Sequence, residues 1–151
     1  MKLTQQADYS LRVLLYLAIE PERVSTIGEI AGAYDVSAHH LAKVAQLLGR
    51  LGYVQLIRGQ AGGLKLAKPA SAIRLGAVLR KTEPSMALVE CFDPENNRCP
   101  ITPACALKGI LANAQEAFLA VIDGYTLADA TKQRAQLSNL LELRLSATAS
   151  R

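Results

Sequence analysis

The sequence predicts a mostly α-helical protein, in which a winged helix-turn-helix with a β-hairpin wing is followed by a long C-terminal dimerisation helix. Three observations predict this fold: apolar residues recur at helical spacing along most of the chain, two short strand patterns flank a glycine-rich segment at residues 59–63, and one apolar stripe continues over residues 105–122. The chain has 151 residues, of which 50% are hydrophobic and 20% charged. This composition fits one ordinary domain, or a small domain with a helical appendage, and excludes a disordered chain.

The first part of the chain predicts a helix-turn-helix. Helices are expected in residues 7–19, 26–34 and 37–51, because each segment combines apolar residues at helical spacing with capping or helix-ending residues. A tight turn at residues 35–36 joins the second helix to the third. Asp35 stands where such turns commonly hold glycine, and aspartate tolerates left-handed backbone geometry better than most residues.

Residues 53–67 predict the wing. Two short strands, at residues 53–58 and 64–67, are joined by glycines that permit the positive φ angles of a hairpin tip. Beyond the wing we expect a helix over residues 71–82, an irregular loop, a long helix from Cys105 and a last amphipathic segment at residues 137–145. The chain thus divides into a winged domain (1–83), a cysteine-bearing loop (84–104), a helical region (105–145) and a frayed tail (146–151).

Positive charge is concentrated in one block of the chain. Between residues 36 and 82 there are eight basic residues and no Asp or Glu, whereas the six basic and six acidic residues from Cys91 onward cancel. The formal net charge of +4 therefore comes from the helix-turn-helix and the wing. Such a block favours a polyanion as the partner, with a basic surface that has no partner as the alternative.

The order of helices and wing indicates that this partner is double-stranded DNA. The third helix would enter a major groove, where Gln and His reach base edges, while basic residues and the helix N-terminus contact phosphates. The wing would reach the adjacent minor groove or backbone. Each of these residues alone also fits a solvated surface group. The predicted DNA-contacting residues are Ser37, Ala38, His39, Lys43, Gln46 and Arg50 on the helix, and Arg58, Gln60 and Lys65 on the wing.

Three cysteines lie in one proline-containing loop, with the spacing Cys91-x7-Cys99-x5-Cys105. An odd number of cysteines this close together is typical of a metal or redox site in a reducing compartment, not of a secreted disulfide framework. Thiolates bind soft metals and iron–sulfur clusters, and the positive end of the following helix would stabilise a thiolate at Cys105. Zinc is the weaker option, because no Cys-x-x-Cys pair or nearby histidine completes four ligands. Three ordinary reduced cysteines and a metal-free thiol–disulfide switch remain alternatives.

Enzymatic activity is not expected. A thiol enzyme using Cys91 or Cys99 would lack an adjacent base, because the two histidines are adjacent at His39 and His40, and the sequence has no nucleotide-binding loop. The longest apolar run, residues 13–19, is too short to span a bilayer, and no targeting segment is recognisable. We therefore expect a cytoplasmic protein that makes no membrane contact.

These residues and their neighbours resemble the Rrf-type winged-helix transcriptional regulators, and among them the nitric-oxide-sensing iron–sulfur repressors. The resemblance covers nearly the whole chain except the C-terminal tail. It is carried by Leu3, Thr4, Asp8, Tyr9, Leu11 and Arg12, and by the segments RGQAGGLKL (58–66), KPASAIR (68–74), CPITPAC (99–105) and YTLAD (125–129). The wing motif is typical of the family, and the cysteine segment is more specific still.

The resemblance implies a homodimer whose long helix from Cys105 crosses its partner. It also implies an iron–sulfur cluster, [2Fe-2S] or [4Fe-4S], one per subunit, on Cys91, Cys99 and Cys105. In such proteins a carboxylate near the N-terminus of the other subunit supplies the fourth ligand, and Asp8 is the matching residue. Asp8 equally fits a carboxylate that stabilises the helix dipole. The implied function is a repressor that binds a palindromic operator and releases it when nitric oxide damages the cluster.

Two features of the cysteine segment bear on this resemblance. Related regulators of cluster homeostasis would have a histidine ligand three residues after the third cysteine, whereas this chain has Lys108, which favours the nitric-oxide-sensing repressors. The interval from Cys91 to Cys99 is longer than is usual in the family, which predicts a wider loop at residues 92–98. A regulator of the same fold that senses iron–sulfur supply or thiol redox state is the alternative function.

Overall fold

The computed structural model describes residues 2–149 of the chain, and the side chains of residues 2–141. The helices are α1 (Gln5–Ile19), α2 (Ile27–Tyr34), α3 (Ala38–Arg50), α4 (Leu75–Thr82), α5 (Ala106–Asp123), α6 (Leu127–Ala130) and α7 (Arg134–Ala149), and the strands are β1 (Val54–Ile57) and β2 (Gly63–Leu66). The mostly α fold with a β-hairpin after the third helix, predicted from the sequence, is therefore confirmed. Within residues 2–149 no helix is both long and apolar enough to span a membrane.

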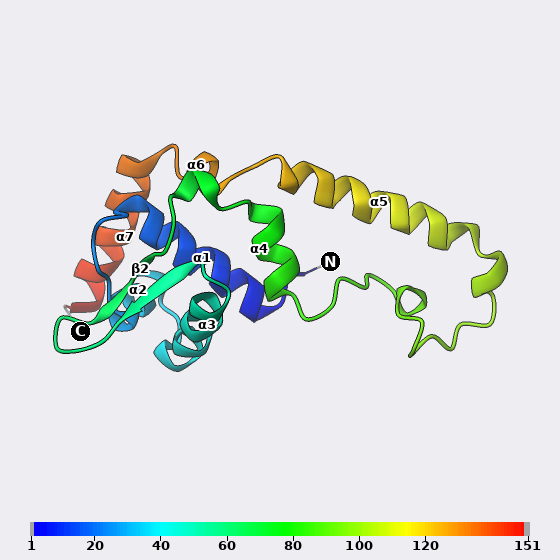
Figure 1. The fold of residues 1–151 in the computed structure, drawn as a ribbon, viewed down its shortest axis with the longest axis horizontal. Coiled ribbons are helices and arrows are strands. Elements are labelled where there is room, and N and C mark those ends of the chain that lie inside the picture. Colours follow the sequence, from blue (N-terminus) through cyan, green and yellow to red (C-terminus); the bar gives the residue numbers. More distant parts are fainter. Residues whose placement is uncertain (1, 150–151) are drawn as a thin grey trace.

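Helix α1 forms the centre of the folded domain. It packs against α3, α4, α6, α7 and β2, and Figure 1 shows α3 below it and α6 above it. Its side chains are part of one core of fully buried apolar residues: Val13, Leu14 and Leu17 of α1, with Ile30, Leu41, Leu48, Leu64, Ile73, Val78 and Leu127. Burial of each of the larger side chains contributes roughly 1.5–3 kcal/mol, so this core determines how the helices are arranged.

One left-handed residue makes the turn between α2 and α3. The Thr26 side chain and Glu29 form a complete capping box at the start of α2. At the other end of that helix Asp35 has φ 53° and ψ 52°, and it is the only non-glycine residue with a positive φ among residues 2–149. The Val36 N–H then donates to the Ala31 carbonyl oxygen at 3.0 Å, which directs the chain into α3. The left-handed turn expected at Asp35 is confirmed.

The wing is fastened to the helix-turn-helix. Strands β1 and β2 are antiparallel, paired from Val54↔Leu66 to Ile57↔Gly63, and Gly59 supplies a φ of +104° near the tip. Leu64 also exchanges two backbone hydrogen bonds with Ser25, of 2.8 and 3.0 Å, just before α2. A Cβ at Gly63 would lie 2.5 Å from the Ser25 carbonyl oxygen, so the close approach requires glycine.

The helix predicted over residues 71–82 is wrong at its start. Residues Ala70–Ala72 form a 3-10 turn, Ile73 and Arg74 are extended, and α4 begins only at Leu75. The extended residues pair with the segment after α5: the Leu127 N–H donates to the Ile73 carbonyl oxygen at 2.8 Å. This pairing with a distant segment replaces the first turn that local periodicity predicted.

The C-terminal helix is longer than the segment predicted at residues 137–145. Helix α7 begins at Arg134, whose guanidinium donates to the Ile19 carbonyl oxygen at the end of α1. It continues to Ala149, and so includes part of the expected tail at residues 146–151. Residues 150 and 151 of that tail lie outside the described part of the chain.

Helix α5 projects away from the domain, as Figure 1 shows. None of its residues is buried. The segment between α4 and α5 contains two 3-10 turns, η2 (Glu90–Phe92) and η3 (Thr102–Ala104), and is otherwise irregular. The long helix and the irregular cysteine loop therefore lie where the sequence predicts them.

The left-handed turn leads to a stability prediction. Asp35→Gly should preserve or raise the free energy of unfolding, whereas Asp35→Ala should lower it by about 1 kcal/mol relative to the glycine variant, because a residue with a Cβ is strained in this conformation. Asp35 is exposed, so neither change removes a buried contact. Urea unfolding followed by circular dichroism measures the difference. Equal stability of the two variants would contradict the role given to this turn.

Candidate DNA interface and cysteine loop

The residues predicted to contact bases and phosphates lie on the exposed side of α3. The opposite side is buried through Leu41, Val44, Ala45 and Leu48. The exposed residues are Ser37, Ala38, His39, Lys43, Gln46 and Arg50. The last four recur at intervals of three and four residues and so share one helix face. Ser37 also caps the helix, because its Oγ accepts a hydrogen bond from the His40 N–H at 3.4 Å.

The wing residues lie on the element that follows α3 directly. Arg58 and Gln60 are exposed near the hairpin tip, and Lys65 is half-buried on β2. Strand β1 packs against α3, and in Figure 1 α3 and the hairpin loop both lie on the lower side of the domain. The structure thus gathers the nine predicted residues on two adjoining elements. Their contact with DNA stays a prediction.

Two further cations lie close to Tyr53, the residue just before β1. Lys68 follows the wing and Lys81 lies on α4, and their ammonium groups are 4.6 and 5.5 Å from the centre of the Tyr53 ring. Tyr53 is only 3% exposed, so its ring offers a fixed surface for both cations. Sequence reasoning missed this cluster, because its members come from separate elements and no spacing relates them.

Asp8 lies in the first turn of α1, where Arg12 binds it. The Arg12 guanidinium contacts both carboxylate oxygens, at 3.2 and 2.9 Å. Arg12 also lies over the rings of Tyr9 and Tyr34, 5.7 and 5.8 Å from their centres. Burial raises the pKa of Tyr34 to about 12, so this phenol remains neutral beside Arg12. The spacing of four residues between Asp8 and Arg12 is the signal that could have revealed the pair.

The three cysteines are free, half-buried thiols on the segment between α4 and α5. Cys91 lies in η2, Cys99 precedes η3, and Cys105 is the N-cap of α5. The loop between them is held by short-range hydrogen bonds, such as Cys99 N–H to Asn97 Oδ1 at 3.1 Å and Thr102 Oγ1 to the Cys99 carbonyl oxygen at 2.9 Å. Among residues 2–141, whose side chains are described, the structure gathers no group of three or more Cys, His, Asp or Glu side chains that could hold a metal ion.

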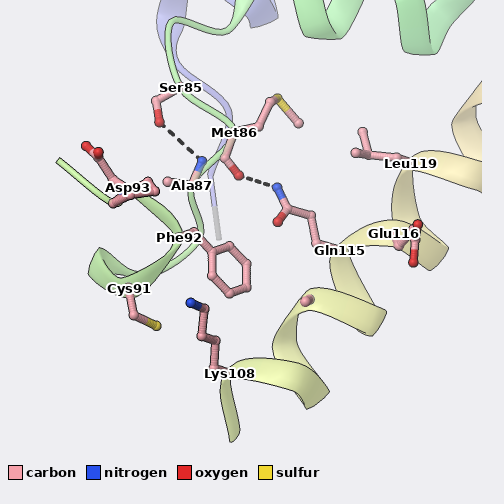
Figure 2. A pocket seen from close by; sticks show the side chains of 12 residues that line it. Ser85, Met86, Ala87, Cys91, Phe92, Asp93, Lys108, Gln115, Glu116 and Leu119 are labelled. Atoms are coloured by element: carbon pink, nitrogen blue, oxygen red, sulfur yellow. Dashed lines mark hydrogen bonds between the residues drawn. The ribbon is translucent and has the colours of Figure 1, made fainter. Parts of the chain in front are cut away.

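A cleft of about 750 Å³ lies between this loop and α5. Figure 2 shows Cys91 and Phe92 on its loop side and Lys108 and Gln115 on its helix side. Gln115 holds the loop in place by donating to the Met86 carbonyl oxygen. The amino group of Lys108 and the sulfur of Cys91 point toward the same part of the cleft. The lining of the cleft therefore includes one of the three thiols and a cation.

A helix-turn-helix that is fixed to a wing and presents a basic exposed face defines a DNA-binding transcriptional regulator. The comparison with protein families agrees with this class. Residues 3–133 match the family model described as "Rrf2: Iron-dependent Transcriptional regulator". This chain belongs to the Rrf2 family. Because this is a family of transcriptional regulators and not of enzymes, the expectation that the chain has no enzymatic activity is confirmed.

The chain is also similar to individual proteins and solved structures. The chain is 49% identical over 145 residues to the "HTH-type transcriptional regulator NsrR" of Geobacillus kaustophilus, covering 95% of this chain and 99% of that protein. It is 48% identical, with the same coverage, to the protein of that name from Bacillus subtilis. The structure of CymR, the global cysteine regulator of B. subtilis, is similar with a TM-score of 0.71 and 26% identity, covering 88% of this chain and 98% of CymR. T. potens IscR shares the fold, with a TM-score of 0.70 and 23% identity over 88% of each chain.

The two parts of the interface should respond differently to substitution. With a duplex that the wild-type protein selects from random-sequence DNA, Arg58→Ala should weaken binding and reduce the slope of log K against log[salt] by about 1, because it removes one phosphate contact. Gln46→Ala should leave the slope unchanged and relax sequence preference at one base pair by about 1–3 kcal/mol. Each variant is the control for the other. Identical salt slopes and identical base preferences in both variants would contradict these roles.

Proposed function

We propose that this chain is a cytoplasmic transcriptional repressor that binds a palindromic operator as a homodimer and senses nitric oxide through an iron–sulfur cluster in each subunit. The observation that carries the proposal is the position of three free thiols on the segment that joins α4 of the DNA-binding domain to the projecting helix α5. A group bound there lies between the two functional parts of the chain. The relation to proteins named NsrR supports the same function.

The exposed face of α5 supports the homodimer. Its apolar stripe includes Leu107, Ile110, Phe118 and Val121, which are 58%, 62%, 37% and 65% exposed. These residues recur along the helix at spacings that place them on one face. A stripe of this length is left in water unless another surface covers it. A second copy offers the same stripe, and two-fold symmetric dimers are the commonest assembly of soluble proteins.

The donor chemistry of the loop fits an iron–sulfur cluster. Cys91, Cys99 and Cys105 would supply three thiolates, and the resemblance assigns the fourth position to Asp8 of the partner subunit. Cys105 is the N-cap of α5, where the backbone N–H groups of the first helical turn point toward the loop. The thiols are not gathered in this structure, so the loop has to rearrange to bring them together. Its short-range hydrogen bonds allow this without loss of the core.

Helix α1 would connect this site to DNA. When bound, the cluster supplies iron with which nitric oxide reacts. Asp8 lies at the start of α1, and the buried face of the same helix packs against α3. A change in what Asp8 binds would therefore reach the recognition helix through a single helix–helix interface. The loop, together with its connection through the cluster to Asp8 of the other subunit, would form the element that switches between two states.

A second candidate function shares the fold but not the signal. Three free, half-buried thiols equally suit a regulator that senses iron–sulfur supply or thiol redox state. The similarity to CymR, a global cysteine regulator, supports a regulator of the same fold with a signal other than nitric oxide. The two functions differ in whether iron is bound and in which signal releases DNA.

Anaerobic purification with iron and acid-labile sulfide counted per chain tests the proposal. Wild-type protein should contain both in stoichiometric amounts, and nitric oxide should release the selected duplex as the visible absorption bleaches. Cys99→Ala should lose the iron and sulfide, because only two thiolates remain in the loop. Asp8→Asn should keep the folded protein but alter the spectrum or lower the iron content.

The matched control for Asp8→Asn is Asp93→Asn. Asp93 lies in the cysteine loop, where its carboxylate already accepts hydrogen bonds from Glu95 and Asn96, at 3.1 and 2.7 Å, so this variant should keep its iron. Absence of iron and sulfide from wild-type protein under strict anaerobiosis would overturn the cluster and leave a thiol sensor. A bound cluster with DNA release caused by iron limitation, and not by nitric oxide, would support the alternative function.

A further inference from the structure

A second set of contacts holds α5 to the DNA-binding domain, at the end of α5 away from the cysteines. The Arg80 guanidinium on α4 donates two hydrogen bonds to the carboxylate of Asp123, the last residue of α5, and each is 2.6 Å long. Arg74 donates a further hydrogen bond to the Asp123 carbonyl oxygen at 3.4 Å. A two-point contact between guanidinium and carboxylate fixes the orientation of both groups, which a single contact does not.

The backbone around this ion pair is also fixed. The Leu75 N–H donates to the Tyr125 carbonyl oxygen at 3.0 Å, and Arg74 and Thr126 form an antiparallel bridge. Thr126 is itself held by a capping box with Asp129 at the start of α6. The chain that leaves α5 is therefore clamped to the chain that enters α4. Hydrogen bonding to Arg80 also lowers the pKa of Asp123, so the carboxylate is charged at neutral pH.

Gly76 provides the space for the Asp123 carboxylate. A Cβ at residue 76 would lie 1.9 Å from Asp123 Oδ1 and 2.9 Å from its Cγ. The backbone there is helical within α4, where alanine is intrinsically more favourable than glycine. A side chain at this position thus conflicts with the ion pair and not with the helix. Gly76 belongs to the same contact as Arg80 and Asp123.

The geometry of α5 gives this contact its importance. The helix has no buried residue, and it meets the folded domain by packing against α4. In the dimer proposed above, α5 binds the partner, so the angle between α5 and its own domain sets the distance between the two recognition helices. With 18 residues, α5 is about 27 Å long, and a small change of angle at one end becomes a displacement of several ångströms at the other.

We propose that Arg80, Asp123 and Gly76 form a rigid joint that determines which half-site spacing the dimer accepts. They act as positioning residues: α3 and the wing contact the bases and phosphates, and the joint holds the two copies of α3 at one separation. This inference rests on the proposed homodimer and palindromic operator. It assigns operator spacing to residues that lie outside the predicted DNA-contacting surface.

The test measures affinity as a function of half-site spacing. The probes are a two-fold symmetric duplex that wild-type protein selects from random-sequence DNA, and the same duplex with one base pair added or removed at its centre, which moves one half-site by about 3.4 Å and rotates it by about 34°. Wild-type protein should bind the altered duplexes at least about tenfold more weakly. Arg80→Gln, Asp123→Asn and Gly76→Ala should each reduce that difference to less than about threefold, with binding to an isolated half-site unchanged.

These variants separate geometry from charge. Arg80→Gln lowers the net charge by one, Asp123→Asn raises it by one, and Gly76→Ala leaves it unchanged, so general attraction to DNA does not explain a shared loss of spacing preference. The matched control is Lys132→Ala, which removes an exposed cation paired with Asp129 at 3.0 Å and leaves the capping hydrogen bonds between Asp129 and Thr126 in place. This control should keep the wild-type spacing preference.

Analytical ultracentrifugation and thermal unfolding of every variant make the outcome decisive. If dimeric, folded variants discriminate spacing as sharply as wild-type protein, the joint is overturned. If wild-type protein is monomeric or selects no symmetric duplex, the proposed dimer fails instead. Should either charge variant fail to fold, Gly76→Ala still decides the question, because alanine favours the α4 helix.

Discussion

The packing of α1 against α3 is the interaction on which the rest of the structure depends. Leu14 and Leu17 on α1 and Leu41 and Leu48 on α3 are at most 1% exposed, and they belong to one core. Because α1 also contacts α4, α6, α7 and β2, each of these elements is placed relative to the recognition helix through α1. The position of the predicted DNA-contacting face therefore depends on the whole core.

Helix α5 obeys a different constraint. With no buried residue, it gains no direction from a core, so its orientation comes from its packing against α4 and from contacts with the chain on either side of it. At the C-terminal end, the two-point contact between Arg80 and Asp123 and the pairing of Arg74 with Thr126 fix it to α4. At the N-terminal end, Cys105 follows an irregular loop. The helix is thus stiff toward the DNA-binding domain and adjustable toward the thiols.

Local chemistry explains which parts of the fold were predictable. The Thr26–Glu29 capping box and the left-handed Asp35 depend on neighbours in the chain, so the helix-turn-helix could be derived from spacing alone. The start of α4 could not, because Arg74 pairs with Thr126, which local periodicity does not register. The Arg80–Asp123 contact could not be predicted either, because the two residues are 43 positions apart in the chain. The cysteine spacing predicted one loop correctly, but thiol chemistry alone does not determine the ligand that the thiols bind.

The contrast between the rigid domain and the loop suits a regulator that has to bind DNA and also respond to a signal. A DNA-binding protein needs α3 and the wing in fixed positions relative to each other. The core and the Ser25–Leu64 pairing provide this. A sensor needs a segment whose contacts are exchanged at little cost in free energy. The cysteine loop meets that need, because its hydrogen bonds, such as those of Asn97 with Thr102 and of Gln115 with Met86, involve no core residue. In the proposed switch, a change in the loop would reach the DNA-binding domain through Asp8 and α1, and that domain would stay folded in both states.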